Sequence, residues 1–543
     1  MRRQIISKIL TWSGAALLGA TIHQGHALGE VPRTFHEAIT VAPTSVNPFT
    51  LDSPAMYQAL SLVVESLARR DLQTNEFVPQ LAESWVLADD RKSVTVKLRP
   101  AALWHDGAPV TADDVIFSWR ALRDPVFKGL IWGAAYHDFL GAEKVDQHTV
   151  RFRWRQAHYD NLVQILLLRI LPQHFFVRHQ QDSAFLSRHL LGSGPYRLQQ
   201  IQKGHALTLV QNPHWWGRAV PYFRDWYQFP IWNFIYVNGP QMAVSLMQRN
   251  QLHFFAMHET TPTTFAKQTK AKMPSNPVRQ ITYQNHVPDR VFNLACNLQD
   301  PILSPTQVRK ALNHLIPREP INEKFFNRQR QLTSSPWGRQ TAFLRLSEPL
   351  WPYSPVRARA LLRSAKWEIP QGKSIWQRAQ ADRVQILQLT VTYYQTHLEK
   401  ILTYLQEALR SQGIELRLQL IPPTSLVQQI QKRNFQLLAY DEMAYGEILP
   451  MAYHSQGKYN TTGLASAKVD QLIDRLQIAF EPDQRRAIEA QLAKEILAEV
   501  PEIFILSESL RQYLVHSDIV RPQDSWPYGI GLAKWSFKAR AKD

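Results

Sequence analysis

The stretch WHDGAPVTADDV, residues 104–115, joins a predicted strand to a predicted helix. Before it, Val94–Leu98 alternates apolar and polar residues, as a strand with one buried face does. His105–Gly107 then supplies a turn. Thr111 is a favourable N-cap, and Asp114 stands at the third helical position, where its carboxylate completes a capping box. A strand, a turn and a helix in such close succession indicate a fold that mixes α and β structure.

The same succession continues along the chain. Four later segments carry apolar residues at helical spacing, at 308–315, 398–409, 469–480 and 488–497. Gly413 follows the second of them at a usual helix stop, and Ile414–Leu420 then alternates like a strand. The whole pattern predicts a mixed α/β fold. A length of 543 residues predicts two or three domains.

The N-terminus is typical of an export signal. A basic start precedes the apolar run Ile9–Ile22, and the small residues Gly25 and Ala27 stand where a signal peptidase reads. We therefore expect a signal peptide over residues 1–27, cleaved after about Ala27, and a periplasmic location. An uncleaved membrane anchor is the alternative. The longest later apolar run, Leu162–Leu171, is interrupted by Gln164 and Arg169.

Net charge and cysteine content exclude some classes of protein. The chain carries +17, and +14 without residues 1–27, but its basic residues are dispersed rather than clustered. This dispersal favours a generally basic surface and no nucleic-acid partner, with binding to anionic surfaces as the alternative. Cys296, the single cysteine, permits no disulfide within the chain and no site of several thiolates, and its apolar neighbours predict burial.

Catalytic motifs are missing from the sequence. It contains no G-x-S-x-G elbow, no H-E-x-x-H helix and no P-loop, and its 19 histidines form no convincing ligand pair. We expect no enzyme activity, no metal site and no cofactor. A triad assembled from distant residues stays open as an alternative.

Several blocks in a fixed order together resemble the family 5 bacterial solute-binding proteins, which include oligopeptide-, dipeptide- and nickel-binding receptors of ABC importers. The blocks are FVPQLAESW at 77–85, residues 104–115, GSGPY at 192–196, NPHWWG at 212–217, FNL at 292–294, VRKALN at 308–313, REPIN at 318–322, Tyr459-Asn460, and VDQLID at 469–474. A finer similarity, to the microcin C-type peptide-binding subgroup, rests on 224–229, 323–329, 526–529 and Trp535.

The resemblance implies a type II periplasmic binding protein in its large, three-subdomain form. Two lobes joined by a two-strand hinge would close on a ligand and present it to a membrane permease with its ATPase. We expect lobe 1 at 28–289 plus 506–543, with a subdomain inserted at about 62–188, and lobe 2 at 290–505. The chain would cross between them near Arg290–Leu294 and Phe504–Tyr513. We expect a monomer whose ligand is a short peptide or peptide-like compound, or alternatively a metal chelate or a glycan.

The resemblance also implies where the ligand lies. In peptide-binding members the ligand runs as an extended strand between the lobes. One edge is expected at Ala42–Pro48 and the other at Tyr440–Tyr445, where many relatives carry an Asp that pairs with the ligand amine. Ala444 stands at that position here. Asp441 or Glu442 then supplies the carboxylate, or the ligand has no free amine there, or both acids lie in a solvated loop.

The candidate ligand-binding residues are thus drawn from both lobes. They are Ser45, Asn47, Trp132, Tyr136, Tyr440, Asp441, Glu442, Met443 and Tyr445.

Overall fold

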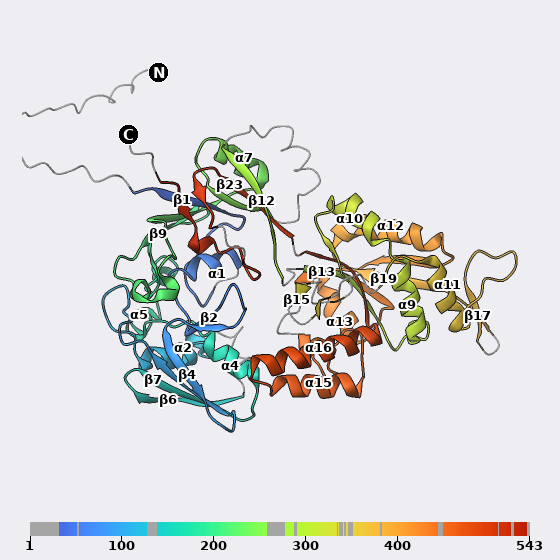
Figure 1. The fold of residues 1–543 in the computed structure, drawn as a ribbon, viewed down its shortest axis with the longest axis horizontal. Coiled ribbons are helices and arrows are strands. Elements are labelled where there is room, and N and C mark those ends of the chain that lie inside the picture. Colours follow the sequence, from blue (N-terminus) through green and yellow to red (C-terminus); the bar gives the residue numbers. More distant parts are fainter. Residues whose placement is uncertain are drawn as a thin grey trace, which may run out of the picture.

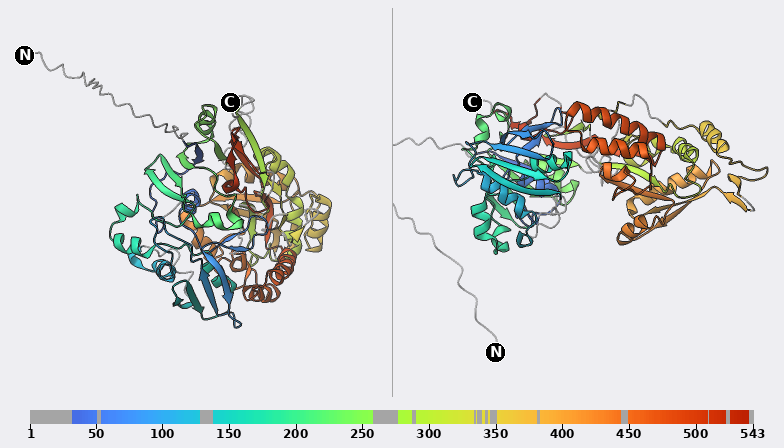
Figure 2. Two further views of the ribbon diagram at one scale, coloured as in Figure 1. Left: turned by 60° about the vertical axis from the view of Figure 1, so that its left-hand side comes forward. Right: turned by 90° about the horizontal axis from the view of Figure 1, so that it is seen from below.

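The computed structural model shows two lobes that lie side by side, each built around its own sheet (Figure 1). It describes residues 32–50, 54–127, 138–257, 277–286, 290–333, 335, 340–341, 344–345, 351–380, 383–443, 449–508, 510–522 and 526–539. Figure 2 (right) shows the same end-to-end arrangement from below. The expected signal peptide, 1–27, lies outside the described residues.

Lobe 1 is centred on a seven-stranded sheet with the order β12-β23-β11-β1-β10-β9-β8. Strand β1 pairs in parallel with β10 and β11, and the other pairs are antiparallel. The strands are β1 (Thr34–Ile39), β8 (Tyr196–Gln202), β9 (Ala206–Gln211), β10 (Ile231–Tyr236), β11 (Phe254–Met257), β12 (Val278–Gln284) and β23 (Leu510–His516). Helices α1 (Pro54–Leu60) and α7 (Pro240–Gln248) belong to the same lobe.

A four-stranded antiparallel sheet, β4-β5-β7-β6, forms the lower part of lobe 1 in Figure 1. Its strands are β4 (Ala82–Leu87), β5 (Ser93–Leu98), β6 (Phe139–Asp146) and β7 (Thr149–Trp154). The helices of this region are α2 (Ala112–Ala121), α4 (Tyr159–Leu166), α5 (Gln173–His179) and α6 (Ser183–Leu186). The paired strands β2 (Ala68–Arg70) and β3 (Phe77–Pro79) lead into it.

The predicted strand–turn–helix unit at 94–115 is confirmed. Oδ2 of Asp114 accepts a hydrogen bond from the backbone N–H of Thr111 at 2.9 Å, so the capping box forms. The other oxygen accepts the N–H of Gln173 at 2.9 Å, and Trp104 Nε1 donates to Oδ2 at 3.3 Å. One carboxylate therefore ties the turn, α2 and the start of α5 together.

Lobe 2 is centred on a six-stranded sheet with the order β14-β22-β13-β21-β19-β20. The strands are β13 (Arg290–Cys296), β14 (Gln331–Leu332), β19 (Gln388–Tyr393), β20 (Glu415–Leu420), β21 (Leu437–Met443) and β22 (Glu502–Glu508). Its helices are α9 (Thr306–Leu315), α10 (Arg318–Phe326), α11 (Pro355–Ser364), α12 (Glu399–Arg410), α13 (Leu426–Gln431), α14 (Leu449–Tyr453), α15 (Ala467–Gln477) and α16 (Pro482–Glu499). Cys296 is fully buried in this lobe, as its neighbours predicted.

Short elements complete the fold. They are the strand pairs β15 (Gln340–Thr341) with β16 (Leu344–Arg345), β17 (Gln377–Gln380) with β18 (Arg383–Ile386), and β24 (Ile519–Val520) with β25 (Ser536–Phe537), and single 3₁₀ turns at 125–127, 216–219, 221–223, 396–398, 423–425 and 532–534.

The chain passes between the two large sheets twice, and the two passages are neighbours. Strands β12 and β23 pair antiparallel in lobe 1, while their continuations β13 and β22 pair antiparallel in lobe 2. Strand β22 stays in the six-stranded sheet as far as Glu508. Two adjacent strand connections, each anchored at both ends in a sheet, are the arrangement of a hinge.

Each lobe has its own hydrophobic core. The largest cluster, which includes Phe35, Trp104 and Trp535, fills lobe 1, so the C-terminal segment returns to that lobe. A second cluster, around Phe292 and Trp376, fills lobe 2, and a third lies along α15 and α16. A mixed α/β fold with separate cores confirms the predicted fold class. Within the described ranges, no helix combines the length and apolar character that crossing a bilayer demands.

Candidate functional site

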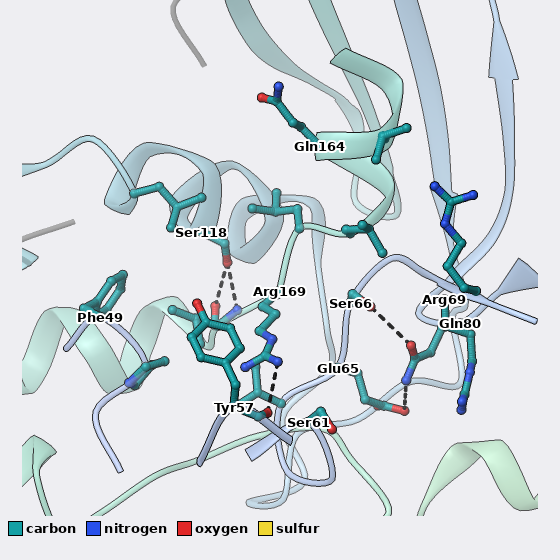
Figure 3. A pocket seen from close by; sticks show the side chains of 18 of the residues that line it. Phe49, Tyr57, Ser61, Glu65, Ser66, Arg69, Gln80, Ser118, Gln164 and Arg169 are labelled. Atoms are coloured by element: carbon teal, nitrogen blue, oxygen red, sulfur yellow. Dashed lines mark hydrogen bonds between the residues drawn. The ribbon is translucent and has the colours of Figure 1, made fainter. Parts of the chain in front are cut away.

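A pocket of about 630 Å³ opens in lobe 1 beside α1, β2, α2 and α4 (Figure 3). Pockets of this size hold small organic ligands. Its polar and aromatic lining residues are Phe49, Tyr57, Ser61, Glu65, Ser66, Arg69, Arg70, Gln80, Ser118, Gln164, Arg169 and Tyr227. Pro48 and several aliphatic residues complete the wall. The lining combines apolar surface with a few charged groups, which is the composition of a ligand site.

The predicted residues Ser45 and Asn47 lie just before this pocket and shape its edge. The side-chain oxygen of Asn47 accepts the N–H of Phe49 at 3.1 Å, which closes an Asx turn. The N–H of Asn47 donates to Ser45 Oγ at 3.1 Å. Asn47 is buried, and the turn places Pro48 and Phe49 in the wall. Both predicted residues therefore position the lining and are not themselves part of it.

Arg169 enters the pocket from the segment that follows α4. Its Nη2 donates to the backbone oxygen of Tyr57 at 3.1 Å, and its guanidinium carbon lies 4.2 Å from the centre of the Tyr57 ring. Its Nη1 is buried with no hydrogen-bond partner. Burial lowers the pKa of Arg169, because a desolvated cation is disfavoured.

Arg69 extends from β2 and stacks on aromatic rings. Its guanidinium carbon lies 4.0 Å from the centre of the Trp226 ring, and Nη1 donates to the hydroxyl of Tyr227 at 3.2 Å. Its Nε is buried without a partner. The neighbouring Arg70 stacks on Phe77 at 3.9 Å. The rings hold these guanidinium groups in fixed orientations.

Glu65 is the one acid among the residues that line the pocket. Its carboxylate accepts hydrogen bonds from four neutral donors: Trp216 at 2.9 Å, Ser193 at 2.9 Å, Trp215 at 3.1 Å and Gln80 at 3.3 Å. Burial raises the pKa of Glu65 to about 7, although the four hydrogen bonds act in the opposite direction. Glu65 therefore carries only a fractional negative charge near neutral pH.

Helix α4, which contributes Val163 and Gln164 to the pocket, meets lobe 2 at its other end. Tyr159, at the start of α4, packs its ring against Phe480, and the guanidinium carbon of Arg485 lies 3.6 Å from the centre of the Tyr159 ring. Burial raises the pKa of Glu489 on α16, while the charges of Arg485 and of the pocket residue Arg70 act to lower it. The pocket thus stands in a wall of lobe 1 whose edge touches lobe 2.

On lobe 2, the predicted residue Asp441 lies at the hinge end of β21 and is 2% exposed. Its carboxylate accepts hydrogen bonds from Arg330 at 3.1 and 2.6 Å, and Arg290 and His397 approach to 3.8 and 3.7 Å. Burial alone would raise the pKa of Asp441, but the contact with His397 and the charges of Arg330 and Arg290 outweigh it and lower the pKa to about 2. Asp441 is therefore ionised and already paired within its own lobe.

The other residues predicted on lobe 2 belong to β21 or lie outside the described residues. The hydroxyl of Tyr440 donates to the buried Glu502 at 3.0 Å, so this side chain serves the core of lobe 2. Glu442 and Met443 continue β21, where their backbones pair with Val291 and Arg290. Trp132, Tyr136 and Tyr445 lie outside the described residues.

Sequence reasoning missed the charged residues of the pocket, although one signal pointed to them. The apolar run 162–171 is interrupted by Gln164 and Arg169, and both line the pocket. A polar residue inside an apolar run is costly to bury unless it has a partner, and a ligand is one kind of partner. Glu65 and Arg69 carry no comparable local signal.

Two lobes joined by two adjacent crossing strands, with a pocket in the wall of lobe 1, form the architecture of a two-lobed binding protein. Residues 76–456 match the family described as bacterial extracellular solute-binding proteins, family 5. The match covers more than half of the chain, which therefore belongs to this family. Its members are binding receptors and not enzymes. No group of three or more metal-ligating side chains occurs in the part of the chain that the structure describes.

The individual relatives and solved structures described next have low sequence identity to this chain. A putative binding protein of Brucella melitensis is 27% identical over 261 residues, which cover 47% of this chain and 42% of the relative. The match thus spans less than half the length of that relative. NikA from Brucella suis, solved with Fe(III)-EDTA, has a TM-score of 0.74 at 18% identity and covers 93% of this chain and 100% of its own. AppA from Bacillus subtilis, solved with a nonapeptide, has a TM-score of 0.64 at 19% identity, with coverages of 94% and 99%. These structures confirm the fold.

Proposed function

We propose that the chain is the periplasmic receptor of an ABC importer, and that it binds oligopeptides or peptide-like compounds between its lobes and delivers them to the membrane permease. The observation that carries this proposal is the 630 Å³ pocket with its arginines and aromatic rings, in a lobe that two adjacent strands join to a second lobe. Family membership and the nonapeptide bound by AppA support it.

In this proposal the ligand works by favouring the closed arrangement of the lobes. A ligand that contacts both lobes binds the closed form more tightly and shifts the population toward it. The hinge is the pair of connections between β12 and β13 and between β22 and β23. We propose lobe 1 as 28–289 plus the C-terminal segment and lobe 2 as the residues between, with the second crossing between Glu508 and Leu510.

Two finer assignments belong to the same proposal. The segments at 224–229 and 323–329 favour the microcin C-type peptide-binding subgroup. The expected contact with a ligand amine stays a prediction for Glu442, because the carboxylate of Asp441 is paired with Arg330.

A carboxylated metal chelate is the second candidate ligand. Three arginines line the pocket against a single acid, and NikA, which shares the fold, was solved with Fe(III)-EDTA. An anionic chelate would suit this balance of charge. A peptide receptor should bind metal-free peptides, whereas a chelate receptor should not.

Thermal unfolding in the presence of each ligand class tests the proposal. A pool of tripeptides with free termini should raise the melting temperature by several degrees, because a ligand at about 100 times its Kd adds about 2.7 kcal/mol. Fe(III)-EDTA and a nickel–histidine complex serve as the chelate arm. A shift with chelates alone would replace the peptide assignment with the chelate one, and no shift in either arm would refute the receptor proposal.

A further inference from the structure

We propose that the end of lobe 2 farthest from lobe 1 docks on an anionic lipid bilayer. The β17–β18 hairpin would enter the headgroup layer, and the arginines of α11 would bind the lipid phosphates. These two elements, together called the distal surface, lie at that end of the molecule (Figure 1). The inference goes beyond the proposed function and is independent of which ligand the receptor carries.

The hairpin has one face that is apolar and exposed. The pairing of β17 with β18 places Ala379 opposite Val384 and Gln377 opposite Ile386. Because side chains alternate along a strand, Ala379, Val384 and Ile386 share one face. Val384 is 65% exposed and Ile386 is 46% exposed. Two large aliphatic side chains therefore face solvent on the same side of the hairpin.

The opposite face of the hairpin is anchored to the lobe. Arg378 donates from Nε to the side chain of Gln385 at 2.7 Å and from Nη2 to the backbone oxygen of Pro301 at 2.9 Å. Its guanidinium carbon lies 4.6 Å from the centre of the Trp367 ring. Strand β17 also exchanges two backbone hydrogen bonds with Glu368, at 2.7 and 2.8 Å. These contacts hold the hairpin with its apolar face outward.

Positive charge is concentrated in the same region. Seven of the 34 residues at 353–386 are basic, against 62 of 543 in the whole chain, and the segment has two acids, Glu368 and Asp382. On α11, the exposed residues Arg359 and Arg363 lie one helical turn apart. The distal surface is therefore positively charged.

The basic side chains of the distal surface are available to an outside partner. Arg359, Arg363, Lys366 and Arg383 are exposed, and none of them forms an ion pair within the described ranges. Their charge is thus not neutralised by acids in the part of the chain that the structure describes.

Exposed apolar side chains beside unpaired cations fit an anionic bilayer better than a soluble polyanion. At a bilayer, cations bind the headgroup phosphates while apolar side chains enter the boundary between headgroups and acyl chains. A soluble polyanion would engage the arginines and leave Val384 and Ile386 in water. The combination of both kinds of side chain therefore selects the lipid surface.

Vesicle co-sedimentation tests this docking. The protein is used in the form expected after cleavage at Ala27, because the apolar run Ile9–Ile22 would bind bilayers by itself. Phosphatidylcholine vesicles are compared with vesicles of equal parts phosphatidylcholine and phosphatidylglycerol. We expect binding to the mixed vesicles to be at least about tenfold tighter and to weaken as salt is added.

Paired variants test the apolar face. Val384→Ser combined with Ile386→Ser should weaken binding to the mixed vesicles at least about fivefold. The control Val86→Ser removes a valine that is 69% exposed on β4 of lobe 1 and should bind as wild type.

A second pair tests the charge. Arg359→Gln combined with Arg363→Gln should weaken binding at least about tenfold. The control Arg178→Gln removes an exposed arginine from α5 of lobe 1 and should change binding much less.

A label at Ala379 reports entry into the headgroup layer directly. Cys296 is fully buried, so Ala379→Cys supplies one accessible thiol for an environment-sensitive fluorophore. Its emission should shift to the blue with mixed vesicles and stay unchanged with neutral ones.

Three results would overturn the inference. They are no vesicle binding by the wild type or equal binding to both vesicle types, equal affinities of the double serine variant and Val86→Ser, and an unshifted emission of the label. An acidic protein as the true partner would give the first result. If the double serine variant does not fold, the label decides. None of these results bears on peptide binding, which the distal variants should retain.

Discussion

Asp441 and Arg330 form an ion pair in which both side chains are 2% exposed, with a shortest N–O distance of 2.6 Å. Removing one partner of such a pair leaves an uncompensated buried charge. Because Asp441 sits where β21 approaches the hinge, its pairing with Arg330 and Arg290 ties the hinge end of lobe 2 together. This pair therefore predicts how the stability of the protein changes with pH.

The pKa of Asp441 falls from 3.8 to about 2 on folding, so its ionised form stabilises the native state. That stability is complete well above pH 4 and is lost as the pH falls from about 4 toward 2. The titration of Asp441 contributes on the order of 2 kcal/mol at pH 7 and about half as much at pH 3, so Asp441→Asn should cost at least about 2 kcal/mol at pH 7 and clearly less at pH 3. Urea unfolding of variant and wild type across this range measures the difference.

Asp113→Asn is the matched control, because Asp113 pairs with Lys144 on the surface with its side chain 53% exposed. Exposed pairs contribute little, so its cost should stay below about 1 kcal/mol at every pH. A cost of Asp441→Asn that does not change between pH 7 and pH 3 would contradict the described pairing.

Local residue roles could be predicted from the sequence, and long-range ones could not. The capping role of Asp114 was predicted because its partner Thr111 is three positions away. Glu65 escaped prediction because Ser193 and Trp216 are 128 and 151 positions away in the chain. These residues become neighbours only in the folded protein, and no local sequence pattern indicates that they do.

At the scale of elements, Arg309 on α9 joins α9 to the end of α16. Its Nε donates to the backbone oxygen of Val500 at 2.8 Å and its Nη2 to that of Glu499 at 2.6 Å. These carbonyls belong to the C-terminal end of α16, where the helix dipole favours a positive charge. Arg309 thereby fixes the helix that meets lobe 1.

We expect Arg309→Met to destabilise the protein by about 2–4 kcal/mol, because several buried carbonyl groups lose their donor at once. Arg309→Lys should recover only part of this, since one ammonium cannot reach both ends of the fork. Lys310→Met, on the same helix, should cost less than about 0.5 kcal/mol. Equal melting temperatures for the Arg309→Met and Lys310→Met variants would show that this connection is unimportant.

Element types were predictable where the apolar pattern was strong. The apolar stripes at 469–480 and 488–497 correspond to α15 and α16, and Gly413 lies beyond α12 with a φ of +81°. Strand order was not predictable, because β21 pairs with β13 across more than a hundred residues. The family resemblance, and not periodicity, supplied the two-lobed architecture.

At the scale of the whole molecule, the lobes touch away from the hinge as well as at it (Figure 1). Arg486 on α16 pairs with Glu76 of lobe 1 at 3.0 Å, and Arg91 pairs with Glu481 at 3.4 Å. The rings of Tyr159 and Phe480 pack nearby. These contacts lie across the lobe boundary, so they stabilise the arrangement of lobes seen in this structure.

Glu76→Lys replaces the attraction to Arg486 with repulsion and should shift ligand-free protein toward a more open arrangement. Because exposed pairs are worth at most about 1 kcal/mol, the open-to-closed ratio should change by no more than about fivefold. Small-angle X-ray scattering would show a larger radius of gyration. Adding Arg486→Glu restores opposite charges and should reverse the change. An unaltered radius in the single variant would exclude any role of this contact in closure.

Native mass spectrometry of the freshly purified protein tests whether the chain is a peptide receptor. We expect complexes whose added mass, once the ligand is released and sequenced, corresponds to a set of short peptides. Release of a metal chelate or a glycan in their place, or a wholly ligand-free protein that also fails to take up added peptides, would contradict it.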